Sequence, residues 1–198
     1  MSDKELKAKI YTELGENYLK IDKLKEAENN FNNALKIDNK NIRALTGLGF
    51  LFLKNQNYKK AIEYFNKAIA LDENYLKALE GLAKAKFYRG DKKESLKYIE
   101  QVLDKDIENV DLIMILEKIA VEKGKYDLLE KYLKKFVAKH EYDVDILYSL
   151  AGVLYLQDKL EEALNFIEKI EKIEKEYYKA IELKNIIIEK LKISEELN

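Results

Sequence analysis

The fold is decided by the stretch Gly47–Asp72, which reads GLGFLFLKNQNYKKAIEYFNKAIALD. Its apolar residues recur at spacings of three and four, which predicts two helices. The first of these helices opens on Gly47 and Gly49, although each glycine in a helix interior costs about 1 kcal/mol relative to alanine. The chain has only 7 glycines and no proline. Two glycines placed together therefore need a physical reason, and we expect that reason to be close packing.

The same pattern recurs at a constant step of 34 residues. Strand signals are weak, since no period-2 alternation is sustained and no Asn-Gly or Asp-Gly turn occurs. The sequence therefore predicts an all-α chain built from repeats. Five copies align without a gap: LGENYLKIDKLKEAENNFNNALKID (14–38), LGFLFLKNQNYKKAIEYFNKAIALD (48–72), LAKAKFYRGDKKESLKYIEQVLDKD (82–106), LEKIAVEKGKYDLLEKYLKKFVAKH (116–140) and LAGVLYLQDKLEEALNFIEKIEKIE (150–174).

This unit resembles the tetratricopeptide repeat family, whose repeat is two antiparallel helices of the same period. The family's proline at the end of the unit is absent in every copy. Four columns of the alignment carry the resemblance. The first helix has a large residue at Leu14, Leu48, Leu82, Leu116 and Leu150, followed by a small residue at Gly15, Gly49, Ala83, Glu117 and Ala151. The second helix has a small residue at Ala27, Ala61, Ser95, Leu129 and Ala163, and then an aromatic or aliphatic residue at Phe31, Phe65, Ile99, Leu133 and Ile167.

The resemblance implies an all-α fold, a right-handed superhelical solenoid of five helix-turn-helix repeats plus a C-terminal capping helix. The array is expected to be single and to span residues 1–198. The repeats are expected at about 8–41, 42–75, 76–109, 110–143 and 144–177, and the capping helix at 178–194.

The small columns predict where the two helices of a pair approach most closely. We expect Gly49 to lie opposite Ala61, where bulkier residues would keep the helices apart. Gly47 and Gly81 border the side of the first helices that would face a ligand. Their bare backbone either lets a ligand approach or relieves crowding, and the sequence leaves both readings open.

Two segments depart from the pattern. The fourth copy has Glu117 and Leu129 at small positions, so we expect its helices to be rotated or splayed, with Ala120 taking over the close contact. The last helix carries more apolar residues than one stripe needs, so it is either a cap tucked against the fifth pair or a surface for self-association. These residues are Ile181, Leu183, Ile186, Ile187, Ile188, Leu191 and Ile193.

Composition excludes several classes of function. The 36 Lys and Arg nearly balance the 37 Asp and Glu, which argues against a general polyanion binder and predicts no nucleic-acid partner. The absence of cysteine excludes disulfides, thiolate metal sites and cysteine nucleophiles. The N-terminus lacks the apolar core of a signal peptide and no run of about 18 apolar residues occurs, so we expect a cytoplasmic protein without a membrane partner.

Catalytic and cofactor motifs are also missing. The single histidine, His140, falls in a predicted turn, where a solvated side chain is more common than a base or a ligand. No HExxH, GxxxxGK[ST] or GxGxxG motif occurs. Clusters such as EKIEKIEKE (168–176) have the Glu/Lys spacing of a solvated helix face. The sequence therefore predicts no enzyme, no cofactor and no metal site.

The resemblance implies that the first helix of each pair lines a concave groove. Groove positions of the first three copies are mainly basic, whereas those of the last two include Asp111, Glu122 and Asp145. The residues predicted to bind a partner are Lys9, Lys20, Arg43, Phe50, Leu53, Lys54, Lys77, Lys84, Phe87, Tyr88, Tyr148 and Tyr155.

The predicted function is a non-catalytic scaffold for protein–protein interaction that binds a peptide or helix of a partner protein, with an acidic segment, in this groove. The alternative is a self-assembling structural module, a homo-oligomer that uses the groove or the C-terminal helix. Some family members clamp acidic chaperone tails with Lys, Asn and Arg residues. Only Lys77 fits that pattern among the matching positions, so we predict no such clamp; these positions hold Thr12, Glu16, Gly47, Lys77 and Gly81.

Overall fold

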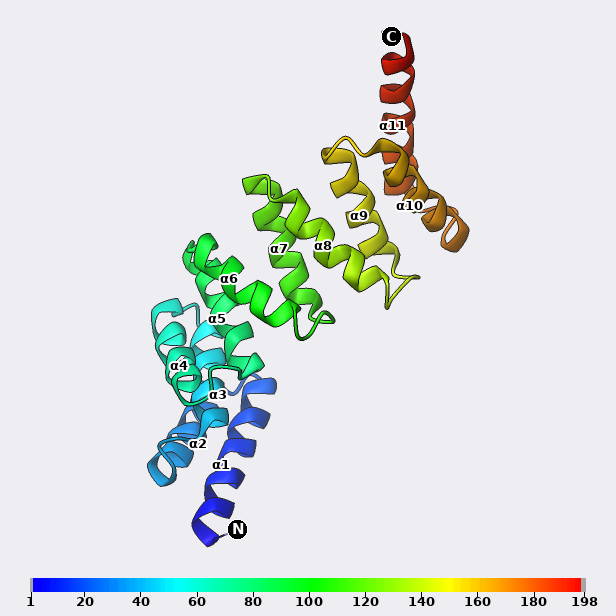
Figure 1. Cartoon of the computed structure of the whole chain (residues 1–198). Coiled ribbons are helices and arrows are strands. Elements are labelled where there is room, and N and C mark those ends of the chain that lie inside the picture. The colour runs from blue at the N-terminus through cyan, green and yellow to red at the C-terminus, as the bar shows by residue number, and fades with distance from the viewer. Residues whose placement is uncertain (1, 197–198) are drawn as a thin grey trace. The chain divides into compact units, whose positions relative to one another are not determined.

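The computed structural model describes the backbone of residues 2–196 and the side chains of residues 2–192. These residues form eleven α-helices and no strand (Figure 1). The all-α prediction is confirmed. The chain divides into two compact units, residues 1–105 and 106–198.

The first unit is a stack of three helical hairpins (Figure 1). Neighbouring helices along the chain pack against each other, and the first helices of successive hairpins are also in contact. The hairpins are α1 (Asp3–Lys20) with α2 (Leu24–Ile37), α3 (Ile42–Lys54) with α4 (Tyr58–Leu71), and α5 (Leu76–Arg89) with α6 (Lys92–Leu103).

The second unit contains two hairpins and a final helix. The final helix packs on both members of the second hairpin. The elements are α7 (Val110–Lys123) with α8 (Tyr126–Val137), α9 (Val144–Leu156) with α10 (Leu160–Ile173), and α11 (Tyr178–Glu196).

Each hairpin turns at an equivalent residue with left-handed backbone. These residues are Asp22, Gln56, Gly90, Gly124 and Asp158, spaced 34 apart, with φ values of 63°, 56°, 95°, 64° and 63°. Glycine adopts such a conformation without steric cost, whereas other residues do so less readily. Asp22 and Asp158 gain a compensating contact, since their carboxylates lie 2.8 Å from Lys54 Nζ and 2.7 Å from Lys190 Nζ.

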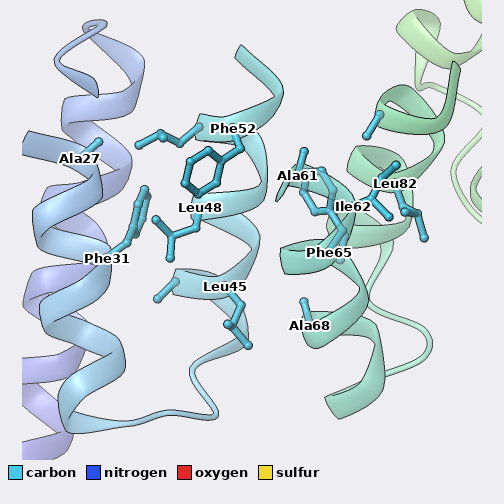
Figure 2. Packing of buried hydrophobic residues seen from close by; sticks show 14 of the residues in the cluster. Ala27, Phe31, Leu45, Leu48, Phe52, Ala61, Ile62, Phe65, Ala68 and Leu82 are labelled. Atoms are coloured by element: carbon cyan, nitrogen blue, oxygen red, sulfur yellow. The ribbon is translucent and has the colours of Figure 1, made fainter. Parts of the chain in front are cut away.

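The core of the first unit explains the paired glycines. Phe31 is fully buried among the core side chains of the first unit (Figure 2). Its ring fills the space beside Gly15 of its own hairpin and Gly47 of the next. A Cβ on Gly15 would lie 2.7 Å from this ring, and a Cβ on Gly47 would lie 2.3 Å from it. No real Cβ contact is that short, so each phenyl ring requires two glycines.

Phe65 repeats this arrangement one hairpin later. A Cβ on Gly49 would lie 2.4 Å from its ring, and a Cβ on Gly81 would lie 2.2 Å from it. The atoms that would lie nearest to a Cβ on Gly49 belong to Phe65, and the close approach of Gly49 to Ala61 stays a prediction. For Gly47 the structure supports relief of crowding, since the atoms beside it belong to Phe31.

Later copies replace the ring and its glycines together. Ile99, Leu133 and Ile167 stand where Phe31 and Phe65 stand, and all are fully buried. The position equivalent to Gly47 and Gly81 is then occupied by a side chain, such as buried Ile115 or Leu183. A smaller aliphatic core residue leaves room for a side chain on the facing helix.

The fourth hairpin departs from the others as expected. Contact between α7 and α8 is the least extensive of the five pairs. Glu117 stays half-buried, whereas Leu129 and Ala120 are fully buried. The carboxylate at Glu117 keeps access to water, so its burial cost is avoided.

The last helix is polar at one position where the first helices of the hairpins are apolar. Lys184 occupies the column of Leu48 and Leu150, and it donates to Glu171 at 2.8 Å. Ala180, Leu183 and Ile187 are buried, whereas Ile181 and Ile186 are 37% and 48% exposed. The side chain of Ile193 lies outside the described residues. Within the part described, α11 covers the fifth hairpin with one stripe and leaves two isoleucines in solvent.

Candidate partner-binding site

The first helices of the three N-terminal hairpins share a cavity of about 340 Å³, which we call the groove cavity. The lining residues from α1 are Glu16, Leu19 and Lys20. Those from α3 are Arg43, Thr46, Gly47 and Phe50, and those from the start of α5 are Tyr75, Lys77 and Glu80. Of the predicted partner-binding residues, the structure brings Lys20, Arg43, Phe50 and Lys77 together here.

Thr46 is the polar residue in the floor of this cavity. It is 2% exposed, and its Oγ1 has no hydrogen-bond partner among the described residues. The equivalent residue one repeat earlier, Thr12, donates to Ala8 O at 2.9 Å and accepts from Asn41 Nδ2 at 3.1 Å. A buried hydroxyl without a partner is costly, so Thr46 differs from the other buried polar residues, Thr12 and Ser95, whose hydroxyls donate to backbone carbonyls.

Arg43 is held by a bidentate pair with Glu16. Its Nε and Nη2 donate to the two carboxylate oxygens at 3.1 and 2.7 Å. The hydrogen bond to Glu16 raises the pKa of Arg43, against the effect of burial. The guanidinium already has an anionic partner, and a ligand carboxylate would have to compete with it.

Two further predicted cations are paired as well. Lys84 Nζ lies 2.7 Å from Glu80, one turn earlier on α5, and its side chain is only 15% exposed. Lys54 pairs with Asp22 of the preceding hairpin. The basic floor expected from the sequence is thus largely neutralised within the chain.

Lys20 and Lys77 are the exceptions. Both are exposed, both line the groove cavity, and neither forms an ion pair with a described residue. They come from α1 and α5, the two helices that flank α3. The uncompensated charge of the cavity is therefore that of two ammonium groups.

Lys9 lies apart from this cluster. It lines a separate cavity of about 490 Å³ between α1 and the start of α3, together with Thr12 and Asn41. Its Nζ is 3.9 Å from Glu13 Oε1 on an exposed helix face. A surface pair of this kind contributes little to stability.

The predicted aromatic residues at the end of α5 pack among themselves. Phe87 and Tyr88 make an edge contact with ring centroids 5.3 Å apart, and Tyr88 also stacks on Tyr58 at 5.9 Å. Tyr88 is 55% exposed, whereas Leu53 and Phe87 are half-buried. These side chains do not line the groove cavity.

In the second unit, the equivalent positions of the first helices include exposed apolar residues. Met114, Val121 and Leu156 are each about half exposed, with values of 52%, 52% and 48%. The predicted residues Tyr148 and Tyr155 are half-buried; Tyr148 packs on Tyr177 at 5.7 Å, and Lys190 lies over the ring of Tyr155 at 5.3 Å.

Tyr75 and Tyr177 were missed by the sequence analysis. Both immediately precede a first helix, at the position held by the N-cap residues Asn41, Asn109 and Asp143. Tyr75 lines the groove cavity, and burial raises its pKa. Burial and the hydrogen bond to Asp145 raise the pKa of Tyr177 to about 12. The sequence signal that could have identified the two tyrosines is their position in the repeat, immediately before a first helix.

No group of three His, Asp or Glu side chains that could hold a metal is found among the described residues. His140 is 41% exposed and packs on the ring of Phe136, with Glu108 at 3.7 Å. No helix within the described range is long and apolar enough to cross a membrane.

Family models identify the repeat directly. Models described as "Tetratricopeptide repeat" match residues 8–41, 42–75 and 144–168. In sequence, no curated protein matches the chain.

Solved structures share the fold at low sequence identity. YrrB, described as a TPR protein with an unusual peptide-binding site, is 17% identical with a TM-score of 0.69, over 88% of this chain and 90% of its own. PilF of Pseudomonas aeruginosa is 16% identical with a TM-score of 0.74, over 96% and 87%. The first TPR of Spaghetti (RPAP3), bound to the HSP90 peptide SRMEEVD, is 26% identical with a TM-score of 0.57, over 60% and 96%.

Proposed function

This chain belongs to the tetratricopeptide repeat family, and from that premise we propose that it is a non-catalytic scaffold that binds a segment of a partner protein on the face formed by α1, α3 and α5. The observation that supports this proposal most is the groove cavity, because three separate first helices contribute to it. Ligand sites are concave and combine apolar walls with polar groups that orient the ligand, and this cavity combines Leu19 and Phe50 with charged side chains.

Two structural relatives support a peptide as the ligand. YrrB is described with a peptide-binding site, and the RPAP3 repeat was solved with a bound HSP90 peptide. Their sequences are distant, so the chemistry of the ligand has to be inferred from this chain's own residues. The two unpaired lysines of the cavity favour a segment that carries acidic residues.

The test is a pull-down from native lysate with three forms of the chain. We expect the unaltered chain to retain a partner that the variant Lys20→Glu with Lys77→Glu loses. The matched control reverses two exposed lysines of α4, Lys59→Glu with Lys67→Glu, and should retain the partner. If the variant Lys20→Glu with Lys77→Glu retained the partner as well as the unaltered chain does, the proposal would be contradicted.

A second candidate is self-association, which a stripe on α1 favours. Leu6, Ile10 and Leu14 are 43%, 46% and 40% exposed, at spacings of four residues on one helix face. The counterparts of Leu14, such as Leu48 and Leu82, are fully buried. Sedimentation velocity at high concentration should then give dimers for the unaltered chain and monomers for Ile10→Lys; monomers for both would exclude this route.

A further inference from the structure

On the premise of the second candidate function, self-association, we propose that two copies of the chain pair through their α1 helices in antiparallel orientation. The contact surface is the α1 stripe, which consists of Leu6, Ile10 and Leu14. A two-fold axis passes beside Ile10, so Ile10 meets Ile10 of the second copy, and Leu6 meets Leu14 of the second copy. Both copies use the same surface, as is usual in symmetric protein dimers.

The α1 stripe belongs to columns that are covered in the other hairpins. α1 packs on α2 and α3, whereas α3, α5 and α9 also pack on the second helix of the preceding hairpin. Ile10 and Leu14 are exposed, but their counterparts in the later first helices are all buried. These counterparts are Ala44, Ala78, Leu112 and Ile146 for Ile10, and Leu48, Leu82, Leu116 and Leu150 for Leu14. An exposed apolar face in otherwise buried columns indicates a surface that a helix can cover.

The spacing of the α1 stripe makes it complementary to itself. Leu6 and Leu14 lie about 6 Å along the helix axis on either side of Ile10. In an antiparallel pair centred on Ile10, each leucine therefore faces a leucine at the same height, and three layers of apolar side chains leave water. Asp3 and Asn17 are exposed at the two ends of the stripe. They also face each other in this pair, where the Asn17 amide can donate to the Asp3 carboxylate.

Charges at the edges of the stripe select the antiparallel orientation. Lys9 and Glu13 lie one turn apart on one edge, with side chains 53% and 46% exposed. In an antiparallel pair this edge faces the same edge of the second copy, so Lys9 of each copy lies near Glu13 of the other. In a parallel pair it would face the opposite edge, and Lys9 would lie near Lys7 of the second copy. Opposite charges therefore favour the antiparallel pair, and like charges oppose the parallel one.

The α1 stripe is separate from the groove cavity. α1 contributes Glu16, Leu19 and Lys20 to that cavity, and none of these residues belongs to the stripe. Pairing of two copies and binding of a partner segment are therefore compatible. A dimer would hold two groove cavities in one assembly, which raises the avidity for a partner that carries two binding segments.

The test is disulfide crosslinking of single-cysteine variants, since the chain itself contains no cysteine. The variants are oxidised at a concentration where the unaltered chain is dimeric in sedimentation velocity. Ile10→Cys should crosslink about tenfold faster than Val121→Cys, because the dimer raises the effective concentration of the second thiol. Val121 is the matched control, an aliphatic residue of α7 that is exposed to a similar extent.

The flanking positions report the orientation of the two helices. Leu6→Cys and Leu14→Cys should each crosslink poorly alone, because each lies about 12 Å along the axis from the same residue of the second copy. A disulfide needs Cα atoms within about 7 Å of each other. A mixture of the two variants, one of them carrying a longer tag, should give the mixed dimer.

Charge variants test the orientation without altering the stripe. Glu13→Lys should weaken dimerisation about tenfold, because like charges replace both symmetric ion pairs. The double variant Lys9→Glu with Glu13→Lys should restore it, since the pairs form again with the charges exchanged. Sedimentation equilibrium measures the dissociation constants, and Glu63→Lys on exposed α4 surface should leave them unchanged.

Equal self-crosslinking at positions 6, 10 and 14 would indicate a parallel pair and overturn the proposal. Crosslinking of Ile10→Cys no faster than that of Val121→Cys would overturn it too, as would a double charge variant that stays weak. If the unaltered chain were still dimeric in sedimentation, self-association would stand and only the α1 contact would be lost. Monomers of the unaltered chain at high concentration would overturn both, and the pull-down test of the groove would be unaffected.

Discussion

At the scale of single residues, the glycines of the first unit are determined by the two buried phenyl rings. Gly15 and Gly47 flank Phe31, and Gly49 and Gly81 flank Phe65. The helix-propensity loss at each glycine is offset by a ring that fills the space between two helices. Where the ring becomes Ile99, the facing position becomes Ile115.

We predict opposite effects of alanine at two helical glycines. Gly47→Ala would place a Cβ 2.3 Å from the Phe31 ring and should lower the free energy of unfolding by about 1–3 kcal/mol. Gly152→Ala meets no atom within 4 Å and should raise it by about 0.5–1 kcal/mol, because alanine favours the helix. Urea unfolding measures both, and a change of the same sign at the two sites would contradict the packing account.

The turn residues give a second prediction. Gln56 has φ of 56° and no ion pair that compensates for it, so Gln56→Gly should stabilise the chain by up to about 1 kcal/mol. Gly90→Ala, at φ of 95°, should destabilise it by about 1 kcal/mol. Thermal unfolding followed by circular dichroism would register both; a lower midpoint for Gln56→Gly would count against the backbone argument.

At the scale of elements, neighbouring hairpins of the second unit are joined by charged side chains. Glu130 of α8 accepts from Lys159 of the next turn at 2.6 Å and lies 2.7 Å from Lys134. Its side chain is only 12% exposed. Burial alone would raise the pKa of Glu130, but hydrogen bonds from Lys134 and Lys159 outweigh it and lower the pKa.

The lowered pKa of Glu130 predicts how the stability contributed by its contacts with Lys134 and Lys159 depends on pH. The ionised form of Glu130 contributes stability above the pKa of the unfolded chain, and this stability is lost as the pH falls through the lowered pKa of the folded chain. Glu130→Gln should therefore be less stable than the unaltered chain at pH 7, by about 1–2 kcal/mol, and the difference should shrink in acid. Glu168→Gln on exposed α10 surface is the control, and a difference that stays constant from pH 7 to pH 2 would oppose this assignment.

Sequence periodicity was sufficient to predict the helices and their hairpins, because each copy keeps the same buried columns. It identified Phe31, Phe65 and Leu48 as core residues, and all three are fully buried. It did not reveal that a Cβ at Gly49 would meet the Phe65 ring, since that contact depends on the rotation of one helix against another.

The binding face was less predictable for a related reason. Sequence position gave the side on which Arg43, Lys54 and Lys84 lie, but their carboxylate partners come from other turns or other hairpins. The net charge summed over the predicted groove positions is therefore larger than the charge that a ligand can pair with. Thr46 and Tyr75 become informative only once the cavity is formed.

At the scale of the whole molecule, we expect this chain to differ from tetratricopeptide repeat proteins that clamp a chain terminus. Residues that would form the clamp are replaced by Thr12, Glu16 and the two glycines Gly47 and Gly81. We predict that the peptide SRMEEVD binds no more tightly with a free C-terminal carboxylate than with an amide. Calorimetry with both peptides measures this, and a tenfold advantage of the free carboxylate would indicate a clamp after all.

The sharpest test of partner binding on the face of α1, α3 and α5 is photo-crosslinking. Benzoylphenylalanine replaces Phe50 in the groove cavity or, as the matched aromatic control, Tyr98 of α6, which lines a separate cavity with Ile69 of α4. We expect the protein captured from lysate to crosslink through position 50 and not through position 98. Crosslinking through position 98 alone would show that the partner binds elsewhere on the chain.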